Sequence, residues 1–150
     1  MAASITVYQS FTELCADGTF DLDGNTFKVS LHTSSHTPSA SGDVVYADVD
    51  AEVANGNGYT TGGATLSGVT WTRSGATSKL DASDVVWTAT DSGITARYAI
   101  IRASGTLNGL VDPLVAYVLL DTTPANVSAS AGNTLTLTWH ANGILTITTS

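Results

Sequence analysis

The sequence predicts an all-β protein, an antiparallel β-sandwich of jelly-roll type with one or two short helices. Charged residues make up 12% of the chain, about half the usual share of roughly 25%, and Thr, Ser, Gly and Asn carry the polar fraction instead. A threonine-rich, lysine-poor composition favours strands because β-branched side chains suit a pleated surface. Turn signals recur about every ten residues, so we expect roughly eight strands in one domain spanning residues 1–150.

An extended arm and a short helix are predicted at the start of the chain. Residues 1–9 are uncharged and β-prone, which is typical of an N-terminal arm. Ser10 followed by Glu13 indicates a capping box, and Asp17-Gly18 indicates a helix stop. We therefore expect one or two helical turns between them.

A hairpin and a second helix are predicted next. The run TFDLDGNTFKVSLHTS at 19–34 predicts two strands around an Asp-Gly turn, with one face of the second strand buried. A loop at 33–43 follows. Val45, Val49 and Val53 are spaced four apart, which predicts a short amphipathic helix that ends at Asn55-Gly56.

The rest of the chain reads as strands. Residues 94–103 and 113–121 are apolar at nearly every position, which predicts central strands buried on both faces. Residues 133–140 alternate cleanly, with Leu135, Leu137 and Trp139 on the inward face. Neither a repeat nor a linker is visible, so one domain remains the expectation.

Charge and cysteine content exclude several function classes. The net charge is −8, and the five basic residues are scattered, so we expect no nucleic-acid partner and no anionic membrane. Cys15 is the only cysteine, which excludes a disulfide within one chain and a cysteine zinc site. The opening residues lack the basic and apolar regions of a signal peptide, so we expect synthesis in the cytoplasm without a Sec-type export signal.

The glycine-rich run GNGYTTGG at 56–63 raises a choice between phosphate binding and a structural loop. It lacks the Lys-Ser/Thr pair of a P-loop and precedes a strand, the wrong order for a phosphate at a helix N-terminus. A structural loop is favoured because Gly56, Gly58, Gly62 and Gly63 supply positive φ or let another backbone approach. Tyr59 would then fix the loop by burying its ring.

Other residues with chemical potential have ordinary alternatives. His32 and His36 could share a metal, yet no third ligand lies nearby in sequence, so hydrogen-bonded or solvated histidines are the default. The eleven aspartates leave a glycosidase-type carboxylate pair open, although most of them sit in turns. The tryptophans could form a sugar-stacking platform, but strand positions favour core packing. We expect no metal, no cofactor and no enzymatic activity.

Several motifs together resemble a known family. In order, these are DGNTFKVSLHTSSHTP, VYADVDAEVANGNGYTTGG, LDASDVVWTATDSGITARYAII and GILTI. This pattern, from about residue 19 onward, is similar to that of the small β-sandwich virion proteins of tailed bacteriophages, several of which are capsid decoration, or cement, proteins. GNGYTTGG and ITARYAI are its most specific parts.

The resemblance implies a structural role in the virion. It implies a homotrimer on the outer face of the head that contacts the major capsid protein and bridges capsomers. We expect the N-terminal arm to make the capsid or subunit contact, through Ile5, Val7 and Tyr8. Two alternatives stay open: a tail-associated module that binds a receptor or carbohydrate, and, last, a carbohydrate-active enzyme. Joint exposure of Trp71, Trp87 and Trp139 would favour sugar binding.

Overall fold

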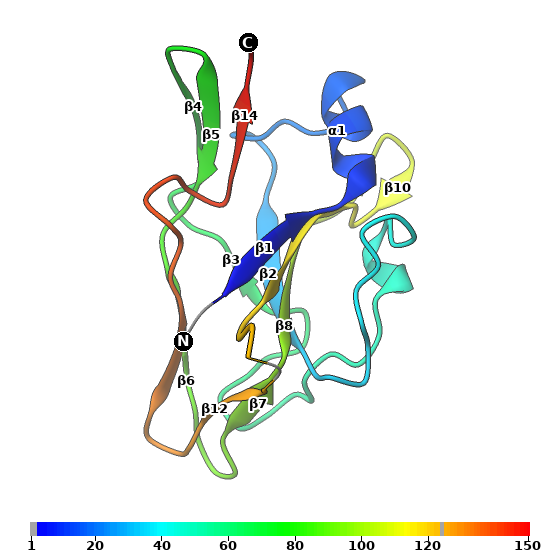
Figure 1. Cartoon of the computed structure of the whole chain (residues 1–150). Helices are drawn as coiled ribbons and strands as arrows, with labels where there is room; N and C mark the ends of the chain where they lie inside the picture. The colour runs from blue at the N-terminus through cyan, green and yellow to red at the C-terminus, as the bar shows by residue number, and fades with distance from the viewer. Residues whose placement is uncertain (1–2, 124) are drawn as a thin grey trace.

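Short antiparallel strands and one α-helix make up the part of the chain that the computed structural model describes, residues 3–123 and 125–150 (Figure 1). The predicted all-β, sandwich-like class is confirmed. In chain order, the elements are β1 (Ser4–Val7), α1 (Gln9–Ala16), β2 (Phe27–His32), the 3-10 turn η1 (Tyr46–Asp48), β3 (Ala64–Thr65), β4 (Thr70–Ser74), β5 (Thr77–Asp81), β6 (Val85–Thr88), β7 (Ile94–Ala96), β8 (Tyr98–Ala103), β9 (Thr106–Leu107), β10 (Leu110–Val111), β11 (Leu114–Leu119), β12 (Val127–Ala129), β13 (Thr134–Leu137) and β14 (Leu145–Thr148).

A five-stranded sheet with the order β1-β11-β8-β2-β3 forms the centre of the fold. β8 and β11 lie side by side within it, where the apolar runs at 94–103 and 113–121 place them. The first run is interrupted at Arg97, and the residues before it form β7, which pairs with β12 in a separate sheet. The backbone N–H of Arg97 donates to the carbonyl of His32, so the chain still touches the central sheet at this bend.

The main core lies between the central sheet and smaller sheets. β4, β5 and β14 form a three-stranded sheet and β6 pairs with β13, and Figure 1 shows both on the left, beside the central sheet. Alternating strands supply the inward side chains, and the predicted inward residues Leu135, Leu137 and Trp139 are buried. The aromatic members of this core are Phe11, Phe20, Phe27, Tyr59 and Trp87.

A second, smaller core lies on the opposite face of the central sheet. Its buried members are Tyr8, Val49, Ile100 and Leu114. Three tyrosines, at positions 46, 98 and 117, pack against them. The segment 44–53 covers this face and is bonded to the sheet at both ends, since Leu114 donates to the carbonyl of Val44 and Val53 to that of Leu31. Both faces of the central strands are therefore buried.

The helix begins one residue before the predicted capping box. Its N-cap is Tyr8, whose side chain makes no capping hydrogen bond, so the capping box of Ser10 and Glu13 is wrong. The tyrosine ring is instead buried in the second core. The predicted stop is in place, because Asp17 caps the helix and Gly18 has a φ of +79°.

Residues 19–26 form a turn, so the predicted hairpin is wrong. Asp21 accepts a hydrogen bond from the backbone of Gly24 at 3.1 Å, which closes the turn. Phe20 and Leu22 point into the main core from this turn, and β2 pairs with β8 and β3 instead. Apolar residues at alternate positions can thus be buried without belonging to a strand.

The helix predicted from three spaced valines is also wrong. Only the short turn η1 forms, and its N-cap Val45 is extended. Ala51 then adopts a φ of +59° and redirects the chain, so that Val49 packs in the second core and Val53 against the main core. A spacing of four residues fits an extended chain as well as a helix, because the strand period is two.

Candidate functional site

The predicted N-terminal arm is a strand of the central sheet. β1 pairs with β11 in the antiparallel sense, with Ser4 opposite Leu119 and Val7 opposite Ala116. Among the described strands it has no neighbour on its other side, which makes it an edge strand. Residues 4–7 therefore belong to the central sheet, but one edge of β1 remains open.

The open edge carries the backbone groups of Ile5 and Val7. Tyr8 donates its backbone N–H to the carbonyl of Val115, its opposite residue, at 3.1 Å. In an antiparallel pair, hydrogen-bonded and non-hydrogen-bonded positions alternate, so Thr6 also bonds to β11 while Ile5 and Val7 do not. Their N–H and C=O groups point outward and are ready to pair with another strand.

An apolar groove lies beside this edge. A cavity of about 310 Å³ adjoins Ala3 and Ile5 on one side and the segment 137–144 on the other. A second cavity of about 250 Å³ continues it past Ala3 toward β12 and β13. We call this surface the β1 groove, and its main apolar residues are Ile5, Val118, Leu137, Trp139 and Ile144. The last four are distant from Ile5 in the chain, so no local sequence pattern places them beside it.

The three predicted interface residues differ in exposure. Ile5 is 38% exposed and lines the β1 groove. Val7 is half-buried and packs against the main core. Tyr8 is completely buried, with its ring 5.4 Å from that of Tyr117, so its side chain cannot be an interface contact as proposed from the sequence. Its ring lies in the second core, whereas the side chain of Val7 packs against the main core on the opposite face of the sheet.

The glycine loop has the backbone geometry that its composition suggests. Gly56, Gly58, Gly62 and Gly63 all have positive φ. A Cβ on Gly58 would collide with the carbonyl of Thr88, and one on Gly63 with the carbonyl of Val29. Gly62 faces open space, with only the tip of the Arg102 side chain within 4 Å. Gly58 and Gly63 therefore allow close approach of two backbones.

Tyr59 fixes this loop to β2. Its ring is buried in the main core and its hydroxyl donates to Glu52 at 2.6 Å. The same hydroxyl accepts the backbone N–H of Leu31 at 3.1 Å. Glu52 also accepts the N–H of Gly62 at 2.6 Å, so one carboxylate joins the two halves of the loop. Burial, together with this bond to Glu52, raises the pKa of Tyr59.

A buried polar cluster lies where the segment 44–53 covers β2. His32 contacts the carbonyl of Asp50 through Nδ1 at 2.8 Å and Ser30 Oγ through Nε2 at 2.9 Å. A carbonyl can only accept, so Nδ1 donates and Nε2 accepts the serine proton. Both side chains are completely buried, which shuts this serine–histidine pair off from any substrate and leaves it a structural link.

Arg102 completes the polar cluster from the neighbouring strand. Its guanidinium lies 3.7 Å from the centre of the Tyr46 ring and donates to the carbonyl of Gly62 at 3.0 Å. Asp112 lies 3.7 Å from its Nε. The arginine is only 4% exposed, so its charge is held by these contacts rather than by water.

The predicted default of hydrogen-bonded or solvated histidines holds for His32, which is hydrogen-bonded as described. His36 differs, because its Nε2 is buried without a hydrogen-bond partner among the described residues and lies 3.6 Å from Asp43. Within residues 3–123 and 125–150, no group of three or more His, Cys, Asp or Glu side chains is placed to hold a metal ion. The helices of the same residues include none that is long and apolar enough to cross a membrane.

The tryptophans are not exposed together. Trp87 and Trp139 are buried, and the indole of Trp139 donates to the carbonyl of Ser83 at 3.0 Å. Trp71 is half-buried and lines a different cavity from Trp139. A stacking platform made of all three is therefore absent, and core packing is the role of two of them.

Comparisons with protein-family models, with curated proteins and with solved structures found no match to this chain. Function is therefore inferred from geometry and from the motifs of the sequence. Of the surfaces described above, the β1 groove is the one that combines unpaired backbone groups with an exposed apolar side chain, that of Ile5, beside an apolar cavity.

Proposed function

We propose that this chain is a structural protein of a tailed-phage virion that binds the outside of the head and bridges capsomers. The motifs GNGYTTGG and ITARYAI, which resemble those of capsid decoration proteins, support this role. The all-β fold and the low share of charged residues agree with a protein that works by covering surface. Its partners would be the major capsid protein and further copies of itself.

The open edge of β1 is the observation that carries the proposal. Strand addition supplies hydrogen bonds from the backbone, and side chains of the added strand enter pockets beside it. Ile5 and Val7 offer the backbone groups, and the β1 groove offers apolar pockets next to Ile5. An extended segment of the capsid protein would become the next strand of the sheet.

The proposed assembly is a homotrimer, and the trimer number comes from the family resemblance. A symmetric oligomer presents several copies of the same edge to a shell of matching symmetry. Once one copy is bound, the others bind at a high effective concentration, so weak individual contacts add to firm attachment. Sedimentation of the purified protein tests the oligomer number directly.

A proline scan of β1 tests attachment. Ile5→Pro removes an outward N–H that makes no bond to β11, so the fold should survive while strand addition fails. Thr6→Pro is the matched variant, because it removes a bond to β11 and should lower the melting temperature. Ile5→Lys places a charge on the open edge of β1 and is a second variant in which strand addition should fail.

The assay mixes each variant with expanded capsids that lack the protein and counts bound copies. Wild-type protein should saturate the capsids, while Ile5→Pro and Ile5→Lys, folded by circular dichroism, should bind far fewer copies. Wild-type occupancy by both variants would show that the edge is not the anchor. Binding of the wild-type protein to host cells or polysaccharide, and never to capsids, would replace the proposal with the tail-associated module.

A further inference from the structure

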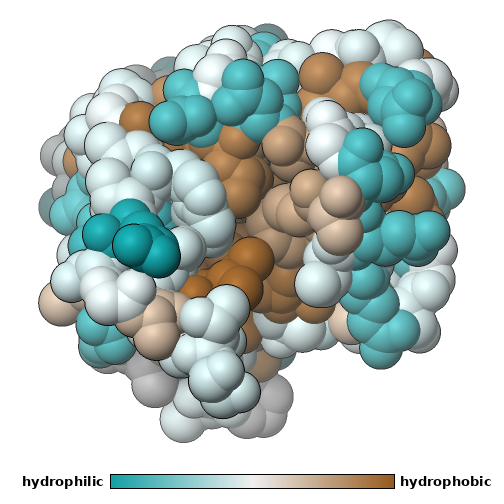
Figure 2. All heavy atoms as spheres, turned by 90° about the horizontal axis from the view of Figure 1, so that it is seen from above, coloured by the Kyte–Doolittle hydropathy of each residue, from teal (hydrophilic) through white to brown (hydrophobic). Residues whose placement is uncertain are grey.

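A second hollow opens at the upper end of the molecule, away from the β1 groove. Figure 2 shows it as a brown depression with paler and teal residues around its rim. Its volume is about 300 Å³. We call it the upper hollow, and its lining residues are Cys15, Phe20, Asp21, Leu22, Asp23, Trp71 and Ile147.

Elements from both ends of the chain build the upper hollow. Phe20 and Leu22 form its buried floor and belong to the main core. Trp71 of β4 and Ile147 of β14 stand on the opposite wall, and Ile147 is 39% exposed. Sites for whole small molecules run from roughly 300 to 1,000 Å³, so this hollow has room for one or two side chains.

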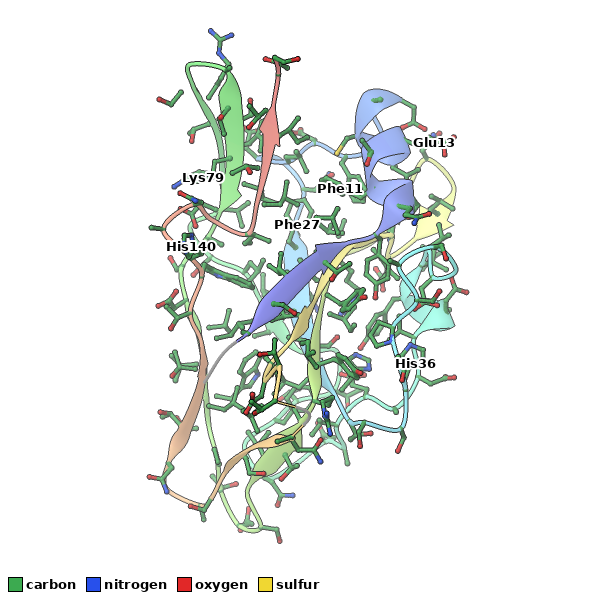
Figure 3. The ribbon with its side chains drawn as sticks, viewed as in Figure 1. Phe11, Glu13, Phe27, His36, Lys79 and His140 are labelled. Carbon is green, nitrogen blue, oxygen red and sulfur yellow. The ribbon has the colours of Figure 1, made fainter. Side chains whose placement is uncertain are left out.

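Unpaired carboxylates flank this apolar surface. Asp21 and Asp23 line the hollow and are exposed. Asp17 lies close enough to Cys15 that its charge, after burial, helps raise the pKa of that thiol to about 11. Within the described residues, none of the three aspartates forms an ion pair with a basic side chain. Glu13 points away from the hollow (Figure 3).

The charge around the hollow selects the kind of partner. The basic residue nearest in sequence to its lining is Arg73, which shares a face of β4 with Trp71 but does not line the cavity. The three aspartates outnumber this one arginine, and the face of the Trp71 indole also attracts positive charge. An acidic partner would be repelled, whereas a basic one gains from both features.

We propose that the upper hollow binds a peptide segment of another protein in which an apolar or aromatic side chain is flanked by Lys or Arg. The apolar side chain fills the space between Trp71 and Leu22, and the flanking cations lie over Asp21 and Asp23. This site shares no residue with the β1 groove, so it does not depend on capsid binding.

The probe is the acetylated and amidated peptide GKKFRKG, titrated into the full-length protein. The indole N–H signals of the three tryptophans, followed by nuclear magnetic resonance, report where it binds. The Trp71 signal should shift with a Kd of about 1 mM or tighter, while those of the buried Trp87 and Trp139 stay still. Raising the salt from about 0.02 M to about 0.5 M should weaken binding.

Two pairs of substitutions separate local charge from net charge. Asp21→Asn with Asp23→Asn should weaken binding by about five-fold or more, and Asp21→Asn keeps the oxygen that accepts from Gly24. Asp91→Asn with Asp121→Asn changes the net charge equally at an exposed and a half-buried position that do not line the hollow, and should leave binding unchanged.

Several results would overturn this inference. One is the lack of a Trp71 shift at millimolar probe, and another is equal binding of the peptide GEEFEEG. A third is equal weakening by the remote aspartate pair, which would indicate general attraction to an acidic protein. A Trp71 shift caused by an N-acetylglucosamine trimer but not by GKKFRKG would identify a sugar subsite instead.

Discussion

The two faces of the central sheet are buried by different means. On one face Val29 and Ile101 pack into an apolar core that strands far along the chain complete. On the other, Ser30, His32 and Arg102 alternate with them and are equally buried, under a covering segment with little regular structure. The first face is held by shape and apolar area, and the second by a smaller apolar core together with hydrogen bonds and an enclosed charge. The second is therefore more sensitive to the loss of single polar groups.

Adjacent isoleucines on β8 compare the two faces directly. Ile101 faces the main core and Ile100 the second core, and both are completely buried. Ile101→Ala should lower the free energy of unfolding by about 4 kcal/mol, and Ile100→Ala by about 2 kcal/mol, because the covering segment can settle into the space. Urea denaturation measures both. Equal losses of stability would mean that the segment 44–53 is as rigid as the elements around the main core.

Neighbouring glycines test how the loop closes over β2. Gly63→Ala adds both a strained φ and a collision with the carbonyl of Val29, so a loss of about 3 kcal/mol is expected. Gly62→Ala adds the strained φ alone and should cost about 1 kcal/mol. The same denaturation series applies. A larger loss of stability for Gly62→Ala than for Gly63→Ala would show that the close backbone approach at Gly63 does not determine the stability of the loop.

A single hydroxyl tests the hydrogen bonds of the loop. Tyr59→Phe leaves the buried N–H of Leu31 without its acceptor and Glu52 with only the N–H of Gly62 as a donor, which should cost about 2 kcal/mol. Tyr98→Phe, at a half-buried tyrosine of the second core, is the matched change and should cost less than about 0.5 kcal/mol. Similar losses in thermal melts would show that ring packing alone holds the loop.

The polar face should weaken in mild acid. Burial lowers the pKa of His32 below its ordinary value of 6.5, against the opposing effect of its bond to Asp50. The titratable and charged groups that face it are Glu52, His36 and Arg102. The unfolded chain then binds the proton more readily, so stability is complete above pH 6.5 and falls as the pH drops below it.

Between about pH 7 and about pH 5 the loss from this histidine is limited to about 2 kcal/mol. Asp48 and Asp81 have lowered pKa values and titrate below 3.8, outside this window. His32→Gln should flatten the slope of stability against pH, whatever its cost at neutral pH. An unchanged slope would assign the pH dependence to another group.

The smallest expected effect is that of a metal chelator. Neither face of the sheet gathers three ligand side chains within the described residues. EDTA should therefore leave the melting temperature unchanged. A drop of several degrees, reversed by calcium or zinc, would assign a metal to His36 with Asp43 or to the turn that contains Asp21.

Sequence patterns predicted strands where a local pattern of apolar residues marks them, and they missed contacts between residues that are distant in the sequence. The alternation of Leu135 and Leu137 and the continuous apolar run of β11 are local signals, and the structure has strands at both. No sequence signal near Ser30 or His32 indicates that residues 44–53 will cover them. The sequence pattern of this strand therefore predicts one buried face and leaves the burial of these two residues unexplained. The β1 groove could not be predicted for the same reason, because Trp139 and Ile144 are more than 130 residues from Ile5 in the sequence.

The pairing of β1 with β11 also orders events in time. Ser4 lies opposite Leu119, so β1 leaves the ribosome about 115 residues before its partner strand is complete. At about 5–20 residues per second, synthesis keeps β1 waiting for roughly 6–20 s, far longer than a hairpin needs to close. The central sheet therefore closes only after β11 has been synthesised, and this long-range pairing should make folding slow. Until then the β1 edge is open on both sides, which makes this interval the period of greatest exposure to aggregation.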